Sequence, residues 1–188
     1  CSGIYFSISG GVRWAKGKGI AESSERTYRI AQHPADPKIV FAGTVHGLWK
    51  SADGGLTWKK ADEGSNEVDS IAIDSEDPNV IYLATERRGI LKSTDGGMTF
   101  VEINEGFVNR NLTAFSREGE LYLTSSYEGE FGGVFATSDD RGLKWALQAN
   151  QQALHGKNVT SIAVDPENPE ELLAGTFDGL LRSSDGGR

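Results

Sequence analysis

The 188-residue sequence has almost no cysteine, no long apolar run and no excess of positive charge. Its single cysteine, Cys1, permits no internal disulfide and says little about the redox compartment. No run of about 18 apolar residues occurs, so no segment is expected to span a membrane as a helix, and no signal-peptide pattern is present. The formal net charge of −8 argues against nonspecific binding to nucleic acid, which needs a basic face.

The residue patterns of several common active sites are missing as well. The sequence contains no P-loop, no nucleophile elbow and no Cys-x-x-Cys pair. Its three histidines (His33, His46 and His155) fall at unrelated positions of the repeat described below, so we expect no metal site and no cofactor. No stretch has a helical hydrophobic period of useful length. The 24 glycines instead suit short strands joined by many turns.

One eight-residue phrase, Ser-x-Asp-Gly-Gly-x-Thr-Trp, is written out repeatedly at intervals of 42 to 45 residues. In the first copy Ser9 replaces the aspartate, and in the fourth Arg141 replaces the first glycine. We name the five copies the serine–aspartate turns, and they occupy residues 7–14, 51–58, 93–100, 138–145 and 183–188. A fixed period of this length predicts one repetitive architecture rather than two ordinary domains.

Each serine–aspartate turn lies between two apolar β-type runs, which predicts a hairpin. The Gly-Gly pair supplies positive φ angles, the serine and aspartate bond to the turn's own backbone, and the aromatic residue at position eight is expected to enter the core. Calcium binding is the alternative, but no copy has the alternating Asp/Asn ligands and later glutamate of an EF-hand loop. We therefore assign a structural role to Ser51, Asp53, Gly55, Trp58, Ser93, Asp95, Gly97, Phe100, Ser138, Asp140, Gly142, Trp145, Ser183 and Asp185.

Each turn belongs to a unit of four short strands. In the second unit we expect strands at 27–33, 39–44, 47–50 and 56–60, with a proline turn after the first of them. The third unit and the last unit repeat this pattern closely. The fourth unit lacks the proline and has an enlarged link, residues 125–132, between its second and third strands.

Four short strands per repeat, with glycine at fixed places, are typical of β-propeller blades. One such sheet cannot bury both of its faces, so the blades must pack on one another. The predicted fold is all-β, a β-propeller of four-stranded antiparallel blades that form an incomplete ring, with further repeats expected in the parent protein. The predicted boundaries are a partial blade at 1–16, blades at about 17–60, 61–103 and 104–148, and a partial blade at 149–188.

The Ser-x-Asp-x-Gly-x-Thr-Trp turns, with Asp-Pro-x-Asn-Pro and Ala-Gly-Thr segments upstream, resemble the Asp-box (BNR) repeat proteins over nearly the whole chain. That family includes sialidases, xyloglucan-type endoglucanases, sortilin-like receptors and photosystem II assembly factors. The resemblance therefore implies a propeller fold without implying one activity. It also implies an extracellular or periplasmic location.

The enzymes of that family differ in the residues that they need. A sialidase would carry an Arg-Ile-Pro motif, whereas the nearest string, residues 28–31, lacks the proline and aligns with the first strands of other units. An endoglucanase would need two carboxylates across a cleft, about 5 to 10 Å apart, and the sequence does not select such a pair among its 27 acidic residues. The Asp-Pro-x-Asn-Pro turn favours the xyloglucan type.

The links between second and third strands are the variable part of the repeat. In an antiparallel sheet they lie at the end opposite the serine–aspartate turns, and variable loops on a constant scaffold commonly carry binding residues. The enlarged link combines two aromatic with two acidic residues, a composition that suits a sugar ring and its hydroxyls. The candidate catalytic residues are Glu128 and Glu130, and the candidate ligand-binding residues are Tyr127, Phe131, Glu86, Arg87, Arg88, His46 and Asp178.

From these observations we predict a glycoside-hydrolase-like or carbohydrate-binding protein whose ligand is a polysaccharide or other glycan. The alternative is a non-catalytic platform for protein binding or assembly. Whether the chain is an enzyme stays open at this point; if it is, the family implies a glycoside hydrolase. Each variable residue taken alone also fits a solvated turn residue without a function.

Overall fold

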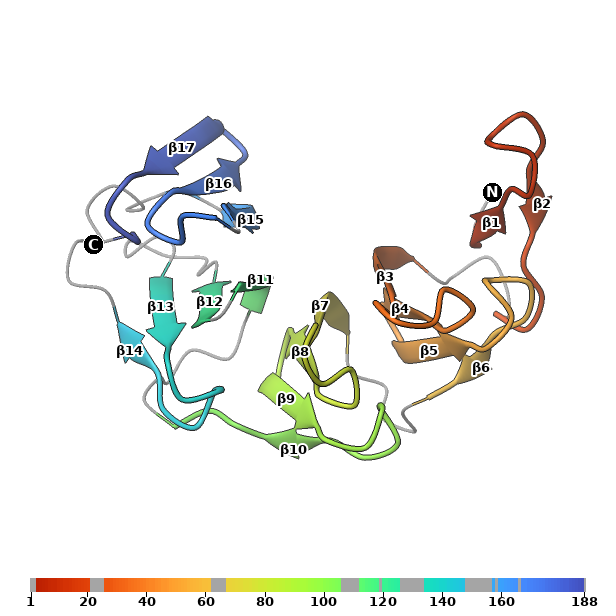
Figure 1. Cartoon of the computed structure of the whole chain (residues 1–188), viewed down its shortest axis with the longest axis horizontal. Coiled ribbons are helices and arrows are strands. Elements are labelled where there is room, and N and C mark those ends of the chain that lie inside the picture. Colours follow the sequence, from red (N-terminus) through yellow and green to blue (C-terminus); the bar gives the residue numbers. More distant parts are fainter. Residues whose placement is uncertain are drawn as a thin grey trace. The chain divides into compact units, whose positions relative to one another are not determined.

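The computed structural model describes residues 3–20, 26–61, 67–105, 112–118, 120–125, 134–147, 157, 159–165 and 167–187. All regular secondary structure in these ranges is β-strand, arranged in five antiparallel sheets (Figure 1). No helix in these ranges is long and apolar enough to cross a membrane. The chain divides into two compact units, residues 1–82 with 93–100 and residues 83–92 with 101–188.

Every sheet is a meander in which strands that follow one another in the chain are hydrogen-bonded neighbours. The first sheet contains β1 (Tyr5–Phe6) and β2 (Ala15–Lys16). The second contains β3 (Thr27–Gln32), β4 (Val40–Thr44), β5 (Gly47–Ser51) and β6 (Lys59–Lys60). The third contains β7 (Val68–Ile73), β8 (Ile81–Thr85), β9 (Gly89–Ser93) and β10 (Val101–Glu102).

The remaining two sheets follow the same plan. The fourth contains β11 (Leu112–Glu118), β12 (Glu120–Ser125), β13 (Val134–Ser138) and β14 (Ala146–Leu147). The last contains β15 (Val159–Val164), β16 (Leu172–Thr176) and β17 (Gly179–Ser183). Four-stranded meanders repeated in this way are the blades of a β-propeller, as the repeat period predicts.

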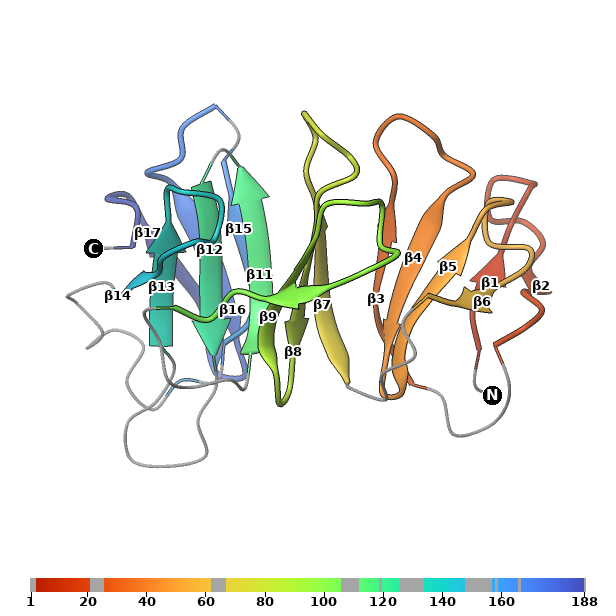
Figure 2. The ribbon, with the colours of Figure 1, turned by 90° about the horizontal axis from the view of Figure 1, so that it is seen from below.

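Antiparallel pairing places alternate turns at opposite ends of each sheet, which Figure 2 shows for the β3–β4 and β4–β5 turns. The serine–aspartate turns therefore share an end with the turns that follow each first strand. Backbone hydrogen bonds join the two kinds of turn directly in three sheets, from Gly54 N to Lys38 O, from Gly96 N to Asn79 O and from Gly186 N to Glu170 O. These bonds tie both hairpins of a blade together at that end.

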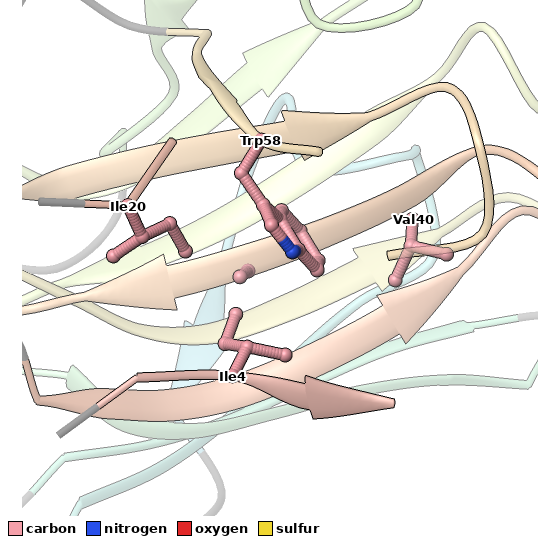
Figure 3. Packing of buried hydrophobic residues seen from close by; sticks show 5 residues of the cluster. Ile4, Ile20, Val40 and Trp58 are labelled. Atoms are coloured by element: carbon pink, nitrogen blue, oxygen red, sulfur yellow. The ribbon is translucent and has the colours of Figure 1, made fainter. Parts of the chain in front are cut away.

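The central strands supply the core. Every residue of β4 and β8 is buried, because these strands are covered on both faces, and this explains why they read as continuous apolar runs rather than as alternating ones. In the first compact unit, Trp58 is 3% exposed and packs with Ile4, Ile20, Val40 and Ala42. Figure 3 shows its indole directed toward Ile4, with Ile20 and Val40 on either side. The eighth position of this turn thus fills the space between two repeats.

Close packing between sheets fixes residue identity at Gly43. A Cβ atom there would lie 2.6 Å from the carbonyl oxygen of Val68, which is closer than carbon and oxygen can approach. Because β4 contacts β7 at this point, glycine is the residue that allows the two sheets to approach this closely.

A lysine that precedes the serine of one turn reaches the next turn along the chain. Lys50 donates from Nζ to the carbonyl of Gly96 at 3.0 Å, and Lys92 donates to the carbonyl of Arg141 at 2.9 Å. The Lys50 ammonium also lies 5.1 Å from the centre of the Phe41 ring, a cation–π distance. We call these two contacts the lysine clamps, and each lies within one compact unit.

Two details differ from the sequence-based expectations. The fourth strand of the second unit, expected at 56–60, is confined to Lys59–Lys60 because Leu56 to Trp58 belong to the turn itself. Trp14 is 64% exposed instead of entering the core. The physical reason is that Trp58 is covered by Ile4 and Ile20 of the preceding repeat, whereas no described residue covers Trp14 in the same way.

Candidate functional site

The serine–aspartate turn at 51–58 is closed by its own side chains. Ser51 Oγ accepts a hydrogen bond from Gly55 N at 2.8 Å and donates to Asp53 Oδ1 at 2.8 Å. Asp53 in turn accepts from the backbone N–H of Thr57 at 2.8 Å and from its hydroxyl at 2.5 Å. Gly54 and Gly55 have φ angles of 75° and 94°, which side-chain-bearing residues rarely adopt. The carboxylate thus serves as a backbone acceptor inside the turn.

The same turn geometry recurs in three other copies, but the residue at the aspartate position accepts fewer hydrogen bonds in some of them. In the copy at 93–100, Asp95 accepts from both the N–H and the hydroxyl of Thr99. Asp140 accepts from the N–H of Lys144 and from the Ser138 hydroxyl, but it has no hydroxyl donor at the threonine position because lysine replaces the threonine there. In the first copy the Ser9 hydroxyl oxygen accepts from Arg13 N at 2.8 Å and so takes over that task of the aspartate.

These hydrogen bonds set the acidity of the turn carboxyl groups. Donation by the Thr57 hydroxyl, followed by the Thr57 N–H and Ser51, lowers the pKa of Asp53 from 3.8 to about 2. The Thr99 hydroxyl is the largest cause of the lowered pKa of Asp95, and the Lys144 N–H lowers the pKa of Asp140. All three groups therefore stay charged at neutral pH. A general acid needs a raised pKa instead, so these carboxylates are suited to holding a turn.

The opposite end of the sheets carries what we call the distal turns, at residues 44–47, 85–89 and 176–179. Each begins with a threonine whose hydroxyl bonds within the turn. Thr44 donates to Gly47 O at 2.9 Å, Thr85 to Gly89 O at 2.8 Å and Thr176 to Gly179 O at 2.9 Å. The same oxygens accept from the backbone N–H of His46, Arg88 and Asp178, respectively. The threonine therefore fixes the base of the turn while the residues at its tip differ.

The distal turn at 85–89 gathers three of the predicted binding residues. Arg88 Nε donates to Glu102 Oε1 at 2.9 Å, and the Asn104 amide bonds to the carbonyl of Arg88 and to Ile90 N. Arg87 lies 3.6 Å from Glu86, and its side chain is 81% exposed. Arg88 is thus committed to β10, whereas Arg87 presents its guanidinium to solvent.

The other described candidates occupy the tips of two further distal turns. His46 is exposed at the tip of the 44–47 turn. Asp178 is also exposed and pairs with Lys157 at 3.0 Å. Its neighbour Phe177 is 78% exposed, which puts an aromatic ring and a carboxylate side by side on one turn. The exposed ion pair between Lys157 and Asp178 contributes only ~0–1 kcal/mol to stability.

Four predicted residues, Tyr127, Glu128, Glu130 and Phe131, lie outside the residues that the structure describes. Sequence reasoning also missed several contributors to the distal turns, namely Glu102, Asn104, Lys157 and the threonine anchors. The anchors had a signal, because threonine recurs at the end of the second strand in three units. Glu102 and Asn104 had none, since they approach Arg88 only through the pairing of β9 with β10.

Comparisons with known proteins identify structural neighbours only. No protein-family model matches the chain, and no curated protein matches it in sequence. Similar solved structures include an ancestral GH74 enzyme, at TM-score 0.71 and 20% identity over 93% of this chain and 24% of that one. A GH74 xyloglucanase from Xanthomonas campestris matches at TM-score 0.63 and 23% identity, over 85% of this chain and 29% of that one. A chain of a nidogen/laminin complex matches at TM-score 0.61 and 21% identity, over 86% of this chain and 62% of that one.

These similarities establish the fold of the chain and show how much of each neighbour it corresponds to. The neighbours are β-propeller proteins, so the chain has the β-propeller fold. It spans about a quarter of the length of the GH74 structures that it matches. At identities below 25%, the similarity carries the arrangement of strands and not the activity.

Proposed function

We propose that the chain is a segment of an Asp-box (BNR) repeat propeller that binds a polysaccharide through its distal turns. The observation that carries this proposal is the contrast between a fixed threonine anchor and a variable, exposed tip in each distal turn. Within the second compact unit, Arg87, Phe177 and Asp178 provide a donor, an aromatic face and an acceptor at these tips, and His46 is the exposed tip residue of the first unit. Sugars are recognised by this mixture, since rings stack on aromatic faces while hydroxyls bond to charged groups.

The GH74 neighbours support a glycan over other ligands, and within that class they favour a β-glucan of the xyloglucan type. One of them is named a xyloglucanase, and its strands superpose on most of this chain. The Asp-Pro-x-Asn-Pro turn of the sequence points in the same direction. A location outside the cytoplasm, extracellular or periplasmic, is part of the same proposal.

Catalysis is a separate part of the proposal. Hydrolysis of a glycoside requires a carboxylic acid of raised pKa and a second carboxylate across the bond. Among the described residues, the carboxyl groups with a clearly shifted pKa are Asp53, Asp95 and Asp140, and in all three the pKa is lowered. Glu128 and Glu130 therefore stay the candidate acid and base, and binding without cleavage is what the described residues support.

The experiment is a panel of soluble β-glucans, including xyloglucan, and sialosides, assayed for release of reducing ends and for binding by isothermal titration. We expect binding of a β-glucan, weakened about fivefold or more in Arg87→Ala by loss of an exposed charge-assisted donor. Lys144→Ala, which removes a cation from a serine–aspartate turn, is the control and should bind as the unchanged chain does. No binding of any glycan in the panel would contradict the proposal.

The enlarged link is tested by two changes, Tyr127→Ala and Glu128→Gln. If this link contacts the glycan, Tyr127→Ala weakens binding, and Glu128→Gln abolishes any turnover while the fold stays intact. Unchanged affinity and turnover in both variants would move the site elsewhere.

A second candidate function is a protein-binding platform. The observation in its favour is the similarity to a chain of a nidogen/laminin complex. A pull-down with the chain as bait, coupled to the same glycan panel, separates the two functions. Capture of a defined protein that Arg87→Ala releases, with no response to any glycan, would favour the platform.

A further inference from the structure

A recess of about 500 Å³ lies at the other end of the sheets, between the sheet β3–β6 and the serine–aspartate turn at 93–100. It belongs entirely to the first compact unit and contains none of the distal-turn residues. Its lining contains three lysines, one acidic, one hydroxyl and one thioether side chain, together with alanine and glycine. The residues that matter for its chemistry are Lys50, Lys59, Lys60, Asp53, Thr57 and Met98.

Lys50 places a fixed positive charge in this recess. The lysine clamp holds its ammonium through one hydrogen bond to the Gly96 carbonyl, and the centre of the Phe41 ring lies 5.1 Å from the same ammonium. An ammonium has three donors, and among the described residues only this one is used. Because neither Gly96 O nor Phe41 carries a full negative charge, the cation stays uncompensated. It is therefore positioned in advance for an anion, at little further entropic cost.

Lys59 and Lys60 add two further cations from β6. Within the part of the chain that the structure describes, neither makes an ion pair. The equivalent two-residue strands elsewhere do not repeat this charge, since β10 is Val101–Glu102 and β14 is Ala146–Leu147. The basic recess is thus a property of this one sheet and not of the repeat.

Basic residues are also concentrated in the part of the chain that supplies the three lysines. Residues 1–60 contain nine Lys and Arg against four Asp and Glu, whereas residues 61–188 contain ten against twenty-three. The net charge of −8 hides a basic first segment and a strongly acidic remainder. Residues 61–82 and 93–100, which complete the first compact unit, add eight acidic and no basic residues, so the attraction for an anion is local to the recess.

We propose that this recess binds an acidic polysaccharide, one that carries carboxylate or sulfate groups, independently of the distal turns. Lys50 and Lys59, which lie opposite each other in the β5–β6 pair and so share one face of the sheet, take the acidic substituents, and Lys60 adds its positive charge beside them. Asp53 and Thr57 face the same space and suit sugar hydroxyls, which can donate as well as accept. Met98, 73% exposed on the opposite wall, offers an apolar surface to the ring.

The mixed lining favours a saccharide over other anions. A phosphodiester chain or a phospholipid headgroup layer presents anionic oxygens densely, and the Asp53 carboxylate would repel them. A uronic acid or sulfated sugar carries one acidic group among several hydroxyls, so it matches three cations beside one carboxylate. Polymer segments can also enter a recess that a flat bilayer would cover without filling.

The experiment measures binding of the full chain to polygalacturonate, dextran sulfate and neutral dextran by biolayer interferometry at two salt concentrations. We expect binding to the two acidic polymers, weakened by salt, and none to neutral dextran. Lys59→Gln/Lys60→Gln should weaken it about tenfold or more through loss of the charge-assisted contact of Lys59 and of the neighbouring charge of Lys60. Lys144→Glu changes the net charge by the same amount outside the recess and should weaken it less than about twofold.

A second pair of variants separates ligand contact from folding. Lys50→Met and Lys92→Met each remove one lysine clamp, but only Lys50 lines the recess. Lys50→Met should weaken binding of polygalacturonate, whereas Lys92→Met should leave it unchanged. Equal losses in both, or a loss in Lys144→Glu as large as that in the double variant, would overturn the proposal.

Other anionic partners are distinguished in the same assay. Duplex DNA or phosphatidylglycerol vesicles that bind more tightly than both acidic polysaccharides, and that lose binding in Lys59→Gln/Lys60→Gln, would replace the proposal by a different partner. Xyloglucan serves as a probe of the distal turns. Loss of xyloglucan binding in Arg87→Ala, with polygalacturonate binding retained, would show that the distal turns and the recess bind their ligands independently.

Discussion

In the three sheets whose distal turns are described, both ends are held by a hydroxyl that bonds within its own turn, yet the two ends differ in which residues can vary. At the serine–aspartate end the serine, the aspartate and both glycine positions are committed to backbone geometry. At the distal end only the threonine and the positive-φ glycine that accepts its hydroxyl are committed in the three described turns, and the tips between them differ in length and charge. The tip residues of the distal turns can therefore differ without loss of the fold. Ligand specificity is expected at this end of the sheets.

The largest expected effect concerns the aromatic position that closes the serine–aspartate end. Trp58→Ala should destabilise the fold by about 3–5 kcal/mol, because it empties a nearly fully buried site. Trp14→Ala is the matched change at an exposed copy and should cost less than about 1.5 kcal/mol. Urea denaturation followed by fluorescence or circular dichroism measures both. Similar losses for the two tryptophans would show that burial is not what distinguishes them.

The next effect tests the anchor of the distal end. Thr85→Val should cost about 1–3 kcal/mol, since it leaves the buried Gly89 carbonyl and the Arg88 N–H without the hydroxyl partner. Thr176→Val removes the same bonds from a more exposed turn, where water can replace them, and should cost less than about 1 kcal/mol. Denaturation midpoints decide the order, and a larger loss at Thr176 would refute the argument from burial.

The third prediction compares two serine–aspartate turns. Asp95→Ala should lower Tm by several degrees, because it removes the acceptor of the Thr99 N–H and hydroxyl and of the Met98 N–H. Asp140→Ala should lower Tm less, because Lys144 offers no hydroxyl to lose. Differential scanning calorimetry provides the two values. A larger drop for Asp140→Ala would contradict the role given to the threonine.

The same carboxylates predict how stability depends on pH. The folded pKa of Asp53, about 2, lies below its ordinary value of 3.8, so the charged form favours folding. Its contribution is complete above the ordinary value and is lost as the pH falls through the folded one. We expect the denaturation midpoint to decline between about pH 4 and pH 2, and to decline less in Asp53→Asn. An equally steep decline in that variant would assign the effect to other groups.

The smallest effect comes from the single described residue other than glycine with a positive φ. Arg141 has a φ angle of 60° at the first glycine position of its turn. Arg141→Gly should stabilise the fold by a few tenths to about 1 kcal/mol, with relief of strain partly offset by greater freedom of the unfolded chain. The reverse exchange, Gly96→Arg, should destabilise by a similar amount. Thermal melts that move in the same direction for both would contradict this account.

Much of the fold could be predicted because its information is local. The period of the turns gave the meander sheets, and the Gly-Gly pairs marked the positive φ angles at Gly54 and Gly55. The exposure of Trp14 could not be predicted, since it depends on which residues of a neighbouring repeat cover the ring. Both copies carry tryptophan at the eighth position, so this position by itself does not distinguish the exposed ring from the buried one.

The candidate sites were less accessible from the sequence for a related reason. Lys50 and Met98 are 48 residues apart and line one recess only because two sheets pack together. Arg88 and Glu102 meet only through the register of β9 and β10, which places Glu102 opposite Leu91. The charged tips at Arg87 and Asp178 were identified as variable positions, but which of them stays exposed depends on such pairings.

The meander plan has a consequence for how the chain acquires its structure. All strand pairing within a sheet is between neighbours in the chain, so closing a sheet requires only short loops. We expect each repeat to form quickly once its own residues are available, with the lysine clamps and Trp58 acting afterwards to align adjacent repeats. Such a chain assembles by stepwise addition of near-equivalent parts, as one-dimensional repeat arrays do. Duplication of one stretch of about 45 residues would then add one more sheet, which pairs its own strands and packs on its neighbour as the other repeats do.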